Sequence, residues 1–121
     1  MSKRVLVVED QEDSMRLMND MLSSAGYEVM KAVTGYEGVA MAESKKPDLI
    51  LMDVMLPGLD GYQATRRIKD NAALRHIPVI AITSLALDGE EGRAKEAGCD
   101  AYFSKPFSPR ALLGEVRRFI G

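Results

Sequence analysis

The sequence predicts an α/β domain in which helices cover both faces of a five-stranded parallel sheet. Three runs, residues 5–8, 49–52 and 79–82, are continuously apolar and rich in β-branched side chains. Strands with this composition are covered on both faces. Stretches with helical spacing of apolar residues lie between these runs, and strands that alternate with helices form repeated βαβ units. This alternation is the basis of the predicted fold class.

Two weaker runs, residues 27–33 and 101–103, complete the five predicted strands. The first helix is predicted between residues 5–8 and 27–33, where apolar side chains recur at three- and four-residue steps. These side chains are Met15, Met18, Leu22 and Ala25. The pattern stops at Gly26, a residue type common at helix C-termini.

The last helix has equally clear signals. Ser108 is a typical N-cap residue, and Pro109 suits the first turn because its fixed φ angle is helical. The apolar face that follows consists of Leu112, Leu113, Val116 and Ile120. The three middle helices, residues 35–44, 61–69 and 88–97, are less well patterned. The fourth is the weakest, since Gly89 and Gly92 each cost roughly 1 kcal/mol relative to alanine inside a helix.

Length and composition predict one globular domain spanning residues 1–121. Sixteen basic against eighteen acidic side chains give a net charge of −2, which argues against a nucleic-acid partner because phosphates require an excess of cations. Cys99 is the single cysteine, so no internal disulfide forms and a reducing compartment is expected. The sequence contains neither a long apolar segment nor a secretory signal, and we therefore expect a cytoplasmic protein with no membrane partner.

Polar side chains follow four of the predicted strands. Glu9 and Asp10 follow the first, Asp53 the third, Thr83 ends the fourth, and Lys105 follows the fifth. Ligands of open parallel sheets bind at the carboxyl ends of the strands, near the point where the strand order reverses. The five side chains are therefore predicted to converge on one rim of the sheet.

Three carboxylates at one rim repel one another unless a cation screens them. Hard oxygen ligands without histidine or cysteine suit Mg²⁺, which binds through a few carboxylates together with phosphate oxygens. Asp53 is the candidate nucleophile, because an aspartate can take a phosphoryl group as an acyl phosphate. Lys105 and Thr83 would supply a positive charge and a hydrogen bond to that group.

Two further carboxylates, Glu12 and Asp13, are predicted to lie outside this site. Both fall at the start of the first helix, where negative charge complements the positive end of the helix dipole. Asp13 is the candidate N-cap residue.

These motifs resemble the receiver domain of bacterial two-component response regulators over essentially the full chain. The resemblance rests on "ED" at residues 9–10, Asp53 followed by "MLPGLDG" at residues 55–61, "TS" at 83–84, and "KP" at 105–106. Each motif alone is weak, but the set occurs in the right order on the right elements. The resemblance implies a doubly wound, flavodoxin-like fold with strand order 2-1-3-4-5.

The same resemblance implies specific roles for residues around the predicted phosphorylation site. Asp53 is the residue expected to be phosphorylated. Mg²⁺ is expected to bind the carboxylates of Asp10 and Asp53 and the backbone carbonyl of Met55, with Glu9 assisting through water.

Three further positions match the signalling machinery of receivers. Thr83 and Tyr102 match the hydroxyl and aromatic switch positions, and Lys105 matches the lysine that contacts the phosphoryl group. The peptide bond between Lys105 and Pro106 is expected to be cis, a geometry accessible to proline.

The implied function is that of a single-domain response regulator in a phosphorelay. It would accept a phosphoryl group from a histidine kinase or a histidine phosphotransfer protein and catalyse only its own phosphorylation and dephosphorylation. Output would be binding of a downstream protein through the fourth helix, the fifth strand and the fifth helix. The chain is similar to stand-alone regulators of the chemotaxis and cell-division types.

Three alternatives remain open on the sequence alone. The chain could be a receiver module excised from a hybrid kinase or a longer regulator. A metal-dependent aspartyl-phosphate phosphatase of the haloacid dehalogenase kind also uses Mg²⁺, but it needs an aspartate where this chain has Met55. A flavin or nucleotide domain of similar layout would cradle phosphate after the first strand, where "EDQED" at residues 9–13 repels anions.

Overall fold

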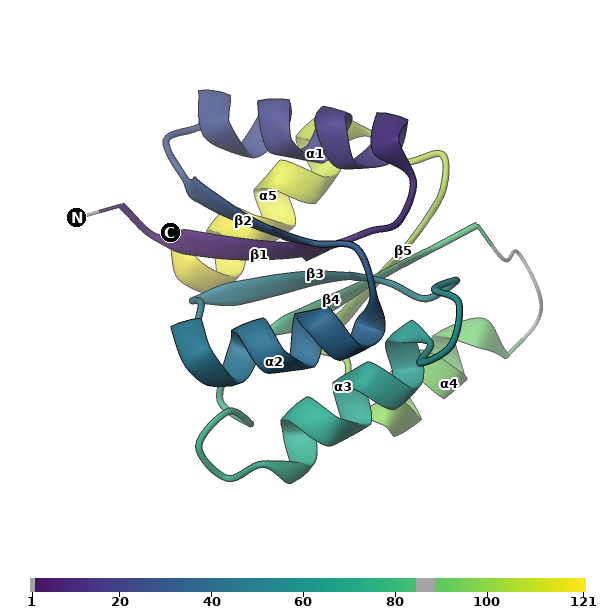
Figure 1. The fold of residues 1–121 in the computed structure, drawn as a ribbon. Coiled ribbons are helices and arrows are strands. Elements are labelled where there is room, and N and C mark those ends of the chain that lie inside the picture. Colours follow the sequence, from purple (N-terminus) through teal and green to yellow (C-terminus); the bar gives the residue numbers. More distant parts are fainter. Residues whose placement is uncertain (1, 85–88) are drawn as a thin grey trace.

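Five strands and five helices alternate along the chain in the computed structural model, which describes residues 2–84 and 89–121 (Figure 1). The elements are β1 (Arg4–Val8), α1 (Glu12–Ser24), β2 (Glu28–Ala32), α2 (Gly35–Lys45), β3 (Leu49–Asp53), α3 (Gly61–Asp70), β4 (Val79–Thr83), α4 (Glu90–Ala97), β5 (Ala101–Ser104) and α5 (Pro109–Ile120). Within the described residues, no helix is long and apolar enough to cross a membrane.

The strands form one parallel sheet in the order β2-β1-β3-β4-β5. Helices α1 and α5 cover one face of the sheet, and α2, α3 and α4 cover the other (Figure 1). Both the predicted fold class and the predicted strand order are confirmed. The order reverses between β1 and β3, which places the switch point of the sheet beside the residues that follow these two strands.

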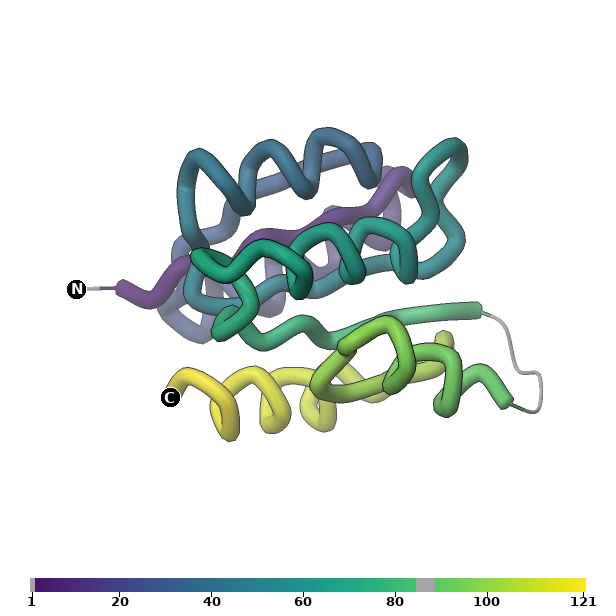
Figure 2. Tube along the Cα trace, turned by 90° about the horizontal axis from the view of Figure 1, so that it is seen from below, coloured from purple at the N-terminus to yellow at the C-terminus, as the bar shows by residue number. Residues whose placement is uncertain are grey.

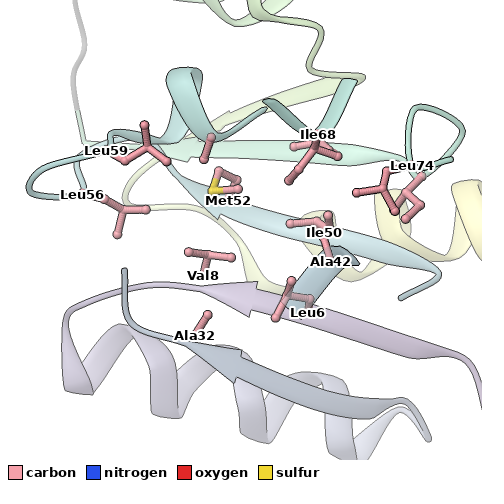
Figure 3. Packing of buried hydrophobic residues seen from close by; sticks show 13 residues of the cluster. Leu6, Val8, Ala32, Ala42, Ile50, Met52, Leu56, Leu59, Ile68 and Leu74 are labelled. Atoms are coloured by element: carbon pink, nitrogen blue, oxygen red, sulfur yellow. The ribbon is translucent and has the colours of Figure 1, made fainter. Parts of the chain in front are cut away.

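Alternate side chains of the central strands enter two separate cores. Val5 and Val7 pack with residues of α1 and α5. Leu6 and Val8 pack with residues of α2, α3 and the segment that follows β3. Figure 3 shows this second core, in which Leu6, Val8 and Ile50 lie among side chains from the covering helices. Burial on both faces explains why β1, β3 and β4 are continuously apolar.

The helices α2, α3 and α4 lie side by side across their face of the sheet (Figure 2). A third, smaller apolar cluster joins α3 and α4 to the sheet. Its members are Val54, Tyr62, Ala81, Ala94 and Ala97. Most of these side chains are small, so this cluster buries less apolar surface than the two main cores.

Several helix ends agree with the sequence prediction. Ser108 precedes α5, and its hydroxyl accepts a hydrogen bond from the amide of Ala111 at 3.2 Å. Pro109 is the first residue of α5. Gly26 follows the end of α1 with φ +94°, a conformation that favours glycine.

The prediction that Asp13 caps α1 is wrong. Gln11 occupies the N-cap position, because its backbone is still extended (φ −90°, ψ 125°), and Asp13 is the second residue inside the helix. Asp13 and Glu12 therefore lie in the first turn, where their charges complement the helix dipole as expected. The sequence prediction also placed Asp88 and Gly89 in the fourth helix. Asp88 lies outside the described residues, and Gly89 precedes α4 with φ +89°.

Two caps were missed in the sequence. The hydroxyl of Thr34 accepts a hydrogen bond from the amide of Glu37 at 3.0 Å and caps α2. Asp60 and Gln63 form a reciprocal capping box at the start of α3. Both have the spacing of a polar residue followed three positions later by Glu or Gln, which is a recognisable start signal.

Gly61, the first residue of α3, makes a close backbone contact with the end of β3. A Cβ atom added at Gly61 would overlap the carbonyl oxygen of Asp53 and lie 2.7 Å from the Cα atom of Val54. Backbone atoms at the end of a central strand cannot move away as a flexible side chain can. Glycine at this position therefore lets α3 start directly against the segment that follows Asp53.

We expect Gly61→Ala to lower the free energy of unfolding by about 2 kcal/mol or more, the scale of other steric clashes with fixed backbone. Gly114→Ala is the matched control, because Gly114 lies inside α5 and a Cβ atom added there would meet no heavy atom within 4 Å. That variant should gain roughly 1 kcal/mol from helix propensity. Urea denaturation of both variants measures the difference, and equal stabilities would contradict the proposed clash.

Candidate functional site

Polar side chains from four strand ends meet at one edge of the sheet. Glu9 and Asp10 directly follow β1, and Asp53 is the last residue of β3. Thr83 is the last residue of β4, and Lys105 directly follows β5. The strands are parallel, so these positions share the carboxyl edge of the sheet, as the sequence predicted.

Glu9 is a fully buried carboxylate with two described hydrogen-bond donors. Its side chain is 0% exposed, and the ammonium group of Lys105 donates to its Oε1 atom at 2.8 Å. The amide of Gln11 donates to its Oε2 atom at 3.1 Å. The backbone of Glu9 is fixed as well, since its amide donates to the carbonyl oxygen of Ala32 at 3.0 Å. A buried charge is tolerated when it is paired and hydrogen-bonded in this way.

Asp53 is also buried, with an exposed fraction of 4%. The amide of Met55 donates to its Oδ1 atom at 3.1 Å, and the ammonium group of Lys105 lies 4.0 Å from its Oδ2 atom. Asp10 is exposed at the same edge. Carboxylate oxygens of Glu9, Asp10 and Asp53 all lie within 4.8 Å of one another.

The two buried carboxyl groups have opposite pKa shifts. Burial raises the pKa of Asp53 to about 7, and the hydrogen bond and negative charge of Glu9 add to this shift. Burial also acts to raise the pKa of Glu9, but hydrogen bonds from Asp53, Lys105 and Gln11 outweigh it and lower the pKa overall. A cation in place of the proton that Asp53 takes up would let both groups ionise.

The donor set fits a hard divalent cation. The three carboxylates offer one oxygen each to a common point, and one of them, Asp10, faces solvent. Magnesium prefers oxygen ligands and retains several waters, which suits a half-open site with few protein ligands. The sequence predicted these carboxylates, and the structure brings them together.

The remaining predicted residues lie at the same edge or next to it. The amide of Lys105 donates to the carbonyl oxygen of Thr83 at 2.7 Å, and the peptide bond between Lys105 and Pro106 is cis, as predicted. Thr83 is fully buried. Tyr102 lies on the outermost strand β5, opposite Ala81 of β4. Lys105 and Thr83 thus flank Asp53 from the side of β4 and β5.

A cleft of about 400 Å³ opens beside the carboxylates, between the segment that follows β3 and α4. Asp10, Met55, Asp60, Tyr62 and Arg93 are among its lining residues. A second hollow of about 680 Å³ lies on the other side of Asp10, between the start of α1 and the end of β2. The acidic edge is therefore open to a small molecule or to a protruding side chain of a partner.

The family model of the response regulator receiver domain matches residues 5–117. The chain belongs to this family. Receiver domains are signalling modules of two-component systems, in which they interact with kinases and downstream targets.

Relatives with names and solved structures support this membership. The polar-differentiation response regulator DivK of Brucella ovis is 42% identical over 121 residues, which cover 100% of this chain and 98% of DivK. The receiver domain of a sensor histidine kinase from Pseudomonas aeruginosa superposes with a TM-score of 0.92 at 39% identity, covering 100% and 99% of the two chains. A magnesium ion is coordinated in the active-site cleft of that receiver. The chemotaxis protein CheY4 of Vibrio cholerae has a TM-score of 0.92 at 27% identity over 99% and 100%.

Sequence reasoning missed one polar group near this receiver site. Tyr62 of α3 and Glu90 of α4 are both buried, and the hydroxyl of Tyr62 donates to the carboxylate of Glu90 at 2.6 Å. Arg93 also contacts this carboxylate, at 3.0 Å. The residues are 28 positions apart in the chain, and neither helical nor strand periodicity pairs positions at that distance.

Asp53→Asn should stabilise the fold in a pH-dependent manner when a chelator removes divalent metal. In the unfolded chain an aspartate titrates near 4, whereas the pKa of Asp53 in the folded chain is raised to about 7. Ionised Asp53 therefore costs folding free energy that accumulates as the pH rises from about 4 to about 7 and is constant above. The stability gain of Asn should grow over this window to about 1 kcal/mol or more.

Urea denaturation in EDTA at pH values from 5 to 8 measures this gain. Asp13→Asn is the control, because Asp13 is an exposed carboxylate in the first turn of α1. It should show no gain that rises with pH. A gain for Asp53→Asn that is the same at every pH would show that burial does not shift its titration.

Proposed function

We propose that residues 1–121 form a receiver domain that acts as a single-domain response regulator and accepts a phosphoryl group on Asp53. The observation that carries this proposal is the group of three carboxylates at the carboxyl edge of the sheet, with the ammonium group of Lys105 at 2.8 Å from one of them and 4.0 Å from another. Membership in the receiver family supports the same chemistry.

The proposed reaction transfers a phosphoryl group to a carboxylate oxygen of Asp53. This oxygen attacks the phosphorus atom of a phosphohistidine on a histidine kinase or a histidine phosphotransfer protein. The phosphorus–nitrogen bond breaks as the phosphorus–oxygen bond forms, and the histidine nitrogen leaves with the bonding electron pair and takes up a proton. Lys105 and the hydroxyl of Thr83 stabilise the negative charge on the transferred oxygens.

Asp10 and Asp53 would hold Mg²⁺ with the backbone carbonyl of Met55, and Glu9 would assist through a water molecule. When bound, the cation neutralises charge on the carboxylates and on the transferred group. The structure fits these roles in two respects: Asp10 is exposed enough to keep water, and Glu9 is held by Lys105 in a fixed position. Magnesium in the active-site cleft of the Pseudomonas receiver supports this assignment.

The output of this receiver is proposed to be protein binding. The acyl phosphate would bond Thr83 and Lys105 better in one of two conformations, with Tyr102 as the second switch residue. The surface affected would comprise α4, β5 and α5, which would bind a downstream protein. We further propose that the protein acts in the cytoplasm, without nucleic-acid or membrane partners and without turning over a separate substrate.

A receiver module excised from a hybrid kinase or a longer regulator is the second candidate, because the chain matches both the response regulator DivK and the receiver domain of the Pseudomonas sensor histidine kinase over nearly their full lengths. A phosphatase of the haloacid dehalogenase kind finds no support, since Met55 occupies the position of its second aspartate. The match of the receiver family model over residues 5–117 favours a receiver over a flavin- or nucleotide-binding domain.

Acetyl phosphate with Mg²⁺ should add one phosphoryl group to the wild-type chain, which intact-protein mass spectrometry measures directly. Asp53→Asn should abolish this adduct, because an amide oxygen does not form an acyl phosphate. Asp13→Asn should be labelled like wild type, because Asp13 lies outside the acidic group. EDTA should prevent labelling in every variant. Label retained on Asp53→Asn would contradict the assignment.

Thr83→Ala should still be phosphorylated but should lose the conformational response. The hydroxyl of Thr83 is the proposed sensor of the phosphoryl group, so its removal separates chemistry from switching. The readout is the set of backbone amide resonances of α4, β5 and α5 before and after acetyl phosphate. Thr83→Ser keeps the hydroxyl and should respond like wild type. Equal resonance changes in Thr83→Ala and wild type would refute this role.

A further inference from the structure

A buried acidic side chain connects α4 to α3. Glu90, the first residue of α4, has an exposed fraction of only 2%. The hydroxyl of Tyr62 donates to its Oε2 atom at 2.6 Å and lies 3.2 Å from its backbone oxygen. The guanidinium of Arg93 contacts the Oε1 atom of Glu90 at 3.0 Å and lies 5.4 Å from the centre of the Tyr62 ring. Tyr62 and Arg93 thus satisfy both carboxylate oxygens.

Few other contacts fix the position of α4. Besides Glu90, its buried residues are Ala94 and Ala97, which bury little apolar surface. The helix has eight residues and contains Gly92, which costs roughly 1 kcal/mol relative to alanine. Short helices depend on tertiary contacts for their stability. With so little apolar surface buried, we expect the hydrogen bond from Tyr62 to contribute to holding α4 in place.

Tyr62 also belongs to an apolar cluster that includes the segment following the proposed phosphorylation site. Its ring packs in one cluster with Val54, the residue after Asp53. Its neighbour Gly61 lies against the carbonyl of Asp53 and donates its amide to the carbonyl oxygen of Val54 at 3.0 Å. Tyr62, which bonds α4, thus also packs in the cluster that contains the residue directly after Asp53.

We propose that Tyr62 and Glu90 are positioning residues that couple α4 to the segment carrying Asp53. The hydrogen bond between them fixes α4 against α3, and the same contact fixes the ring of Tyr62 against Val54. This proposal rests on the proposed function for the role of Asp53, while the coupling itself is a property of the fold.

The chemistry of the pair favours a lasting contact. Burial and then the hydrogen bond to Glu90 raise the pKa of Tyr62, so its hydroxyl remains a donor throughout the ordinary pH range. Phenylalanine in place of Tyr62 would leave the buried carboxylate with Arg93 alone on the described side chains, and Arg93 itself is largely exposed. Loss of a donor to a buried charge is costly because the acceptor cannot regain water.

Hydrogen exchange tests the coupling without any ligand. Glu90→Ala, a change on α4, should speed exchange about tenfold at the amides of Val54 and Gly61, the scale expected for losing a hydrogen bond to a charged group. Tyr62→Phe should speed exchange at the amide of Ala97 in α4 by a similar factor. Glu90→Gln retains an acceptor for the hydroxyl and should restore most of the protection at all three amides.

Tyr27→Phe is the matched control. Tyr27 is buried in the opposite core, and its hydroxyl also donates to a carbonyl oxygen, that of Gly121, at 3.1 Å. Its loss removes a hydroxyl of the same kind from the opposite side of the sheet and should not change exchange at these three amides relative to the rest of the molecule. Unchanged exchange at Val54 and Gly61 in Glu90→Ala, or equal effects of Tyr27→Phe, would overturn the coupling.

Binding of beryllofluoride, a mimic of the phosphoryl group on aspartate, tests the consequence for the site. In ¹⁹F NMR titrations with Mg²⁺, Tyr62→Phe should weaken binding roughly fivefold, because a less preorganised segment binds less tightly. The effect should disappear in a Glu90→Ala background, and Tyr27→Phe should bind like wild type. Unchanged or tighter binding in Tyr62→Phe would overturn the positioning role.

These experiments separate two kinds of failure. If wild type does not bind beryllofluoride, the proposed function fails, and the exchange data alone decide whether the coupling exists. If wild type binds but exchange at Val54 and Gly61 does not respond to Glu90→Ala, the coupling fails and the proposed function stands.

Discussion

The ion pair between Glu9 and Lys105 is the constraint around which the acidic edge is organised. Glu9 is wholly buried, and an unpaired carboxylate there would cost several kcal/mol. Its compensating charge comes from a residue 96 positions later in the chain, directly after the outer strand β5. The ammonium group that satisfies Glu9 is thereby placed 4.0 Å from Asp53. Lys105 thus both stabilises the buried Glu9 carboxylate and supplies positive charge at the proposed phosphorylation site.

Helix α4 buries less apolar surface than α1 and α5 on the other face of the sheet. Long apolar side chains such as Met18, Leu22 and Leu112 anchor α1 and α5. By contrast, α4 rests on alanines and on one buried polar contact between Tyr62 and Glu90. The acidic edge draws on both halves of the sheet. The ends of β1 and β3 supply its carboxylates, and the ends of β4 and β5 supply its hydroxyl and ammonium groups. A chemical change at that edge therefore acts close to α4, a helix that buries little apolar surface.

The sequence was sufficient to predict those site residues whose proximity follows from the strand topology alone. Asp53 and Lys105 end up close because each terminates or follows a parallel strand, and that position is visible in the apolar pattern. It failed where the outcome depends on local backbone or on helix packing. Asp13 does not cap α1 because the extended residue is Gln11, a backbone property that residue preference does not reveal. The pairing of Tyr62 with Glu90 depends on the rotation of α3 against α4.

The small side chains beneath α4 determine how easily that helix can move. Where long side chains such as leucine interdigitate, a helix can shift only if those side chains first separate. The short side chains of Ala94 and Ala97 interdigitate little, so a shift of α4 along the sheet loses little dispersion energy. Movement of α4 is then opposed mainly by directional polar bonds, which break over a fraction of an ångström. Such a contact is suited to discrete changes of position rather than to gradual deformation.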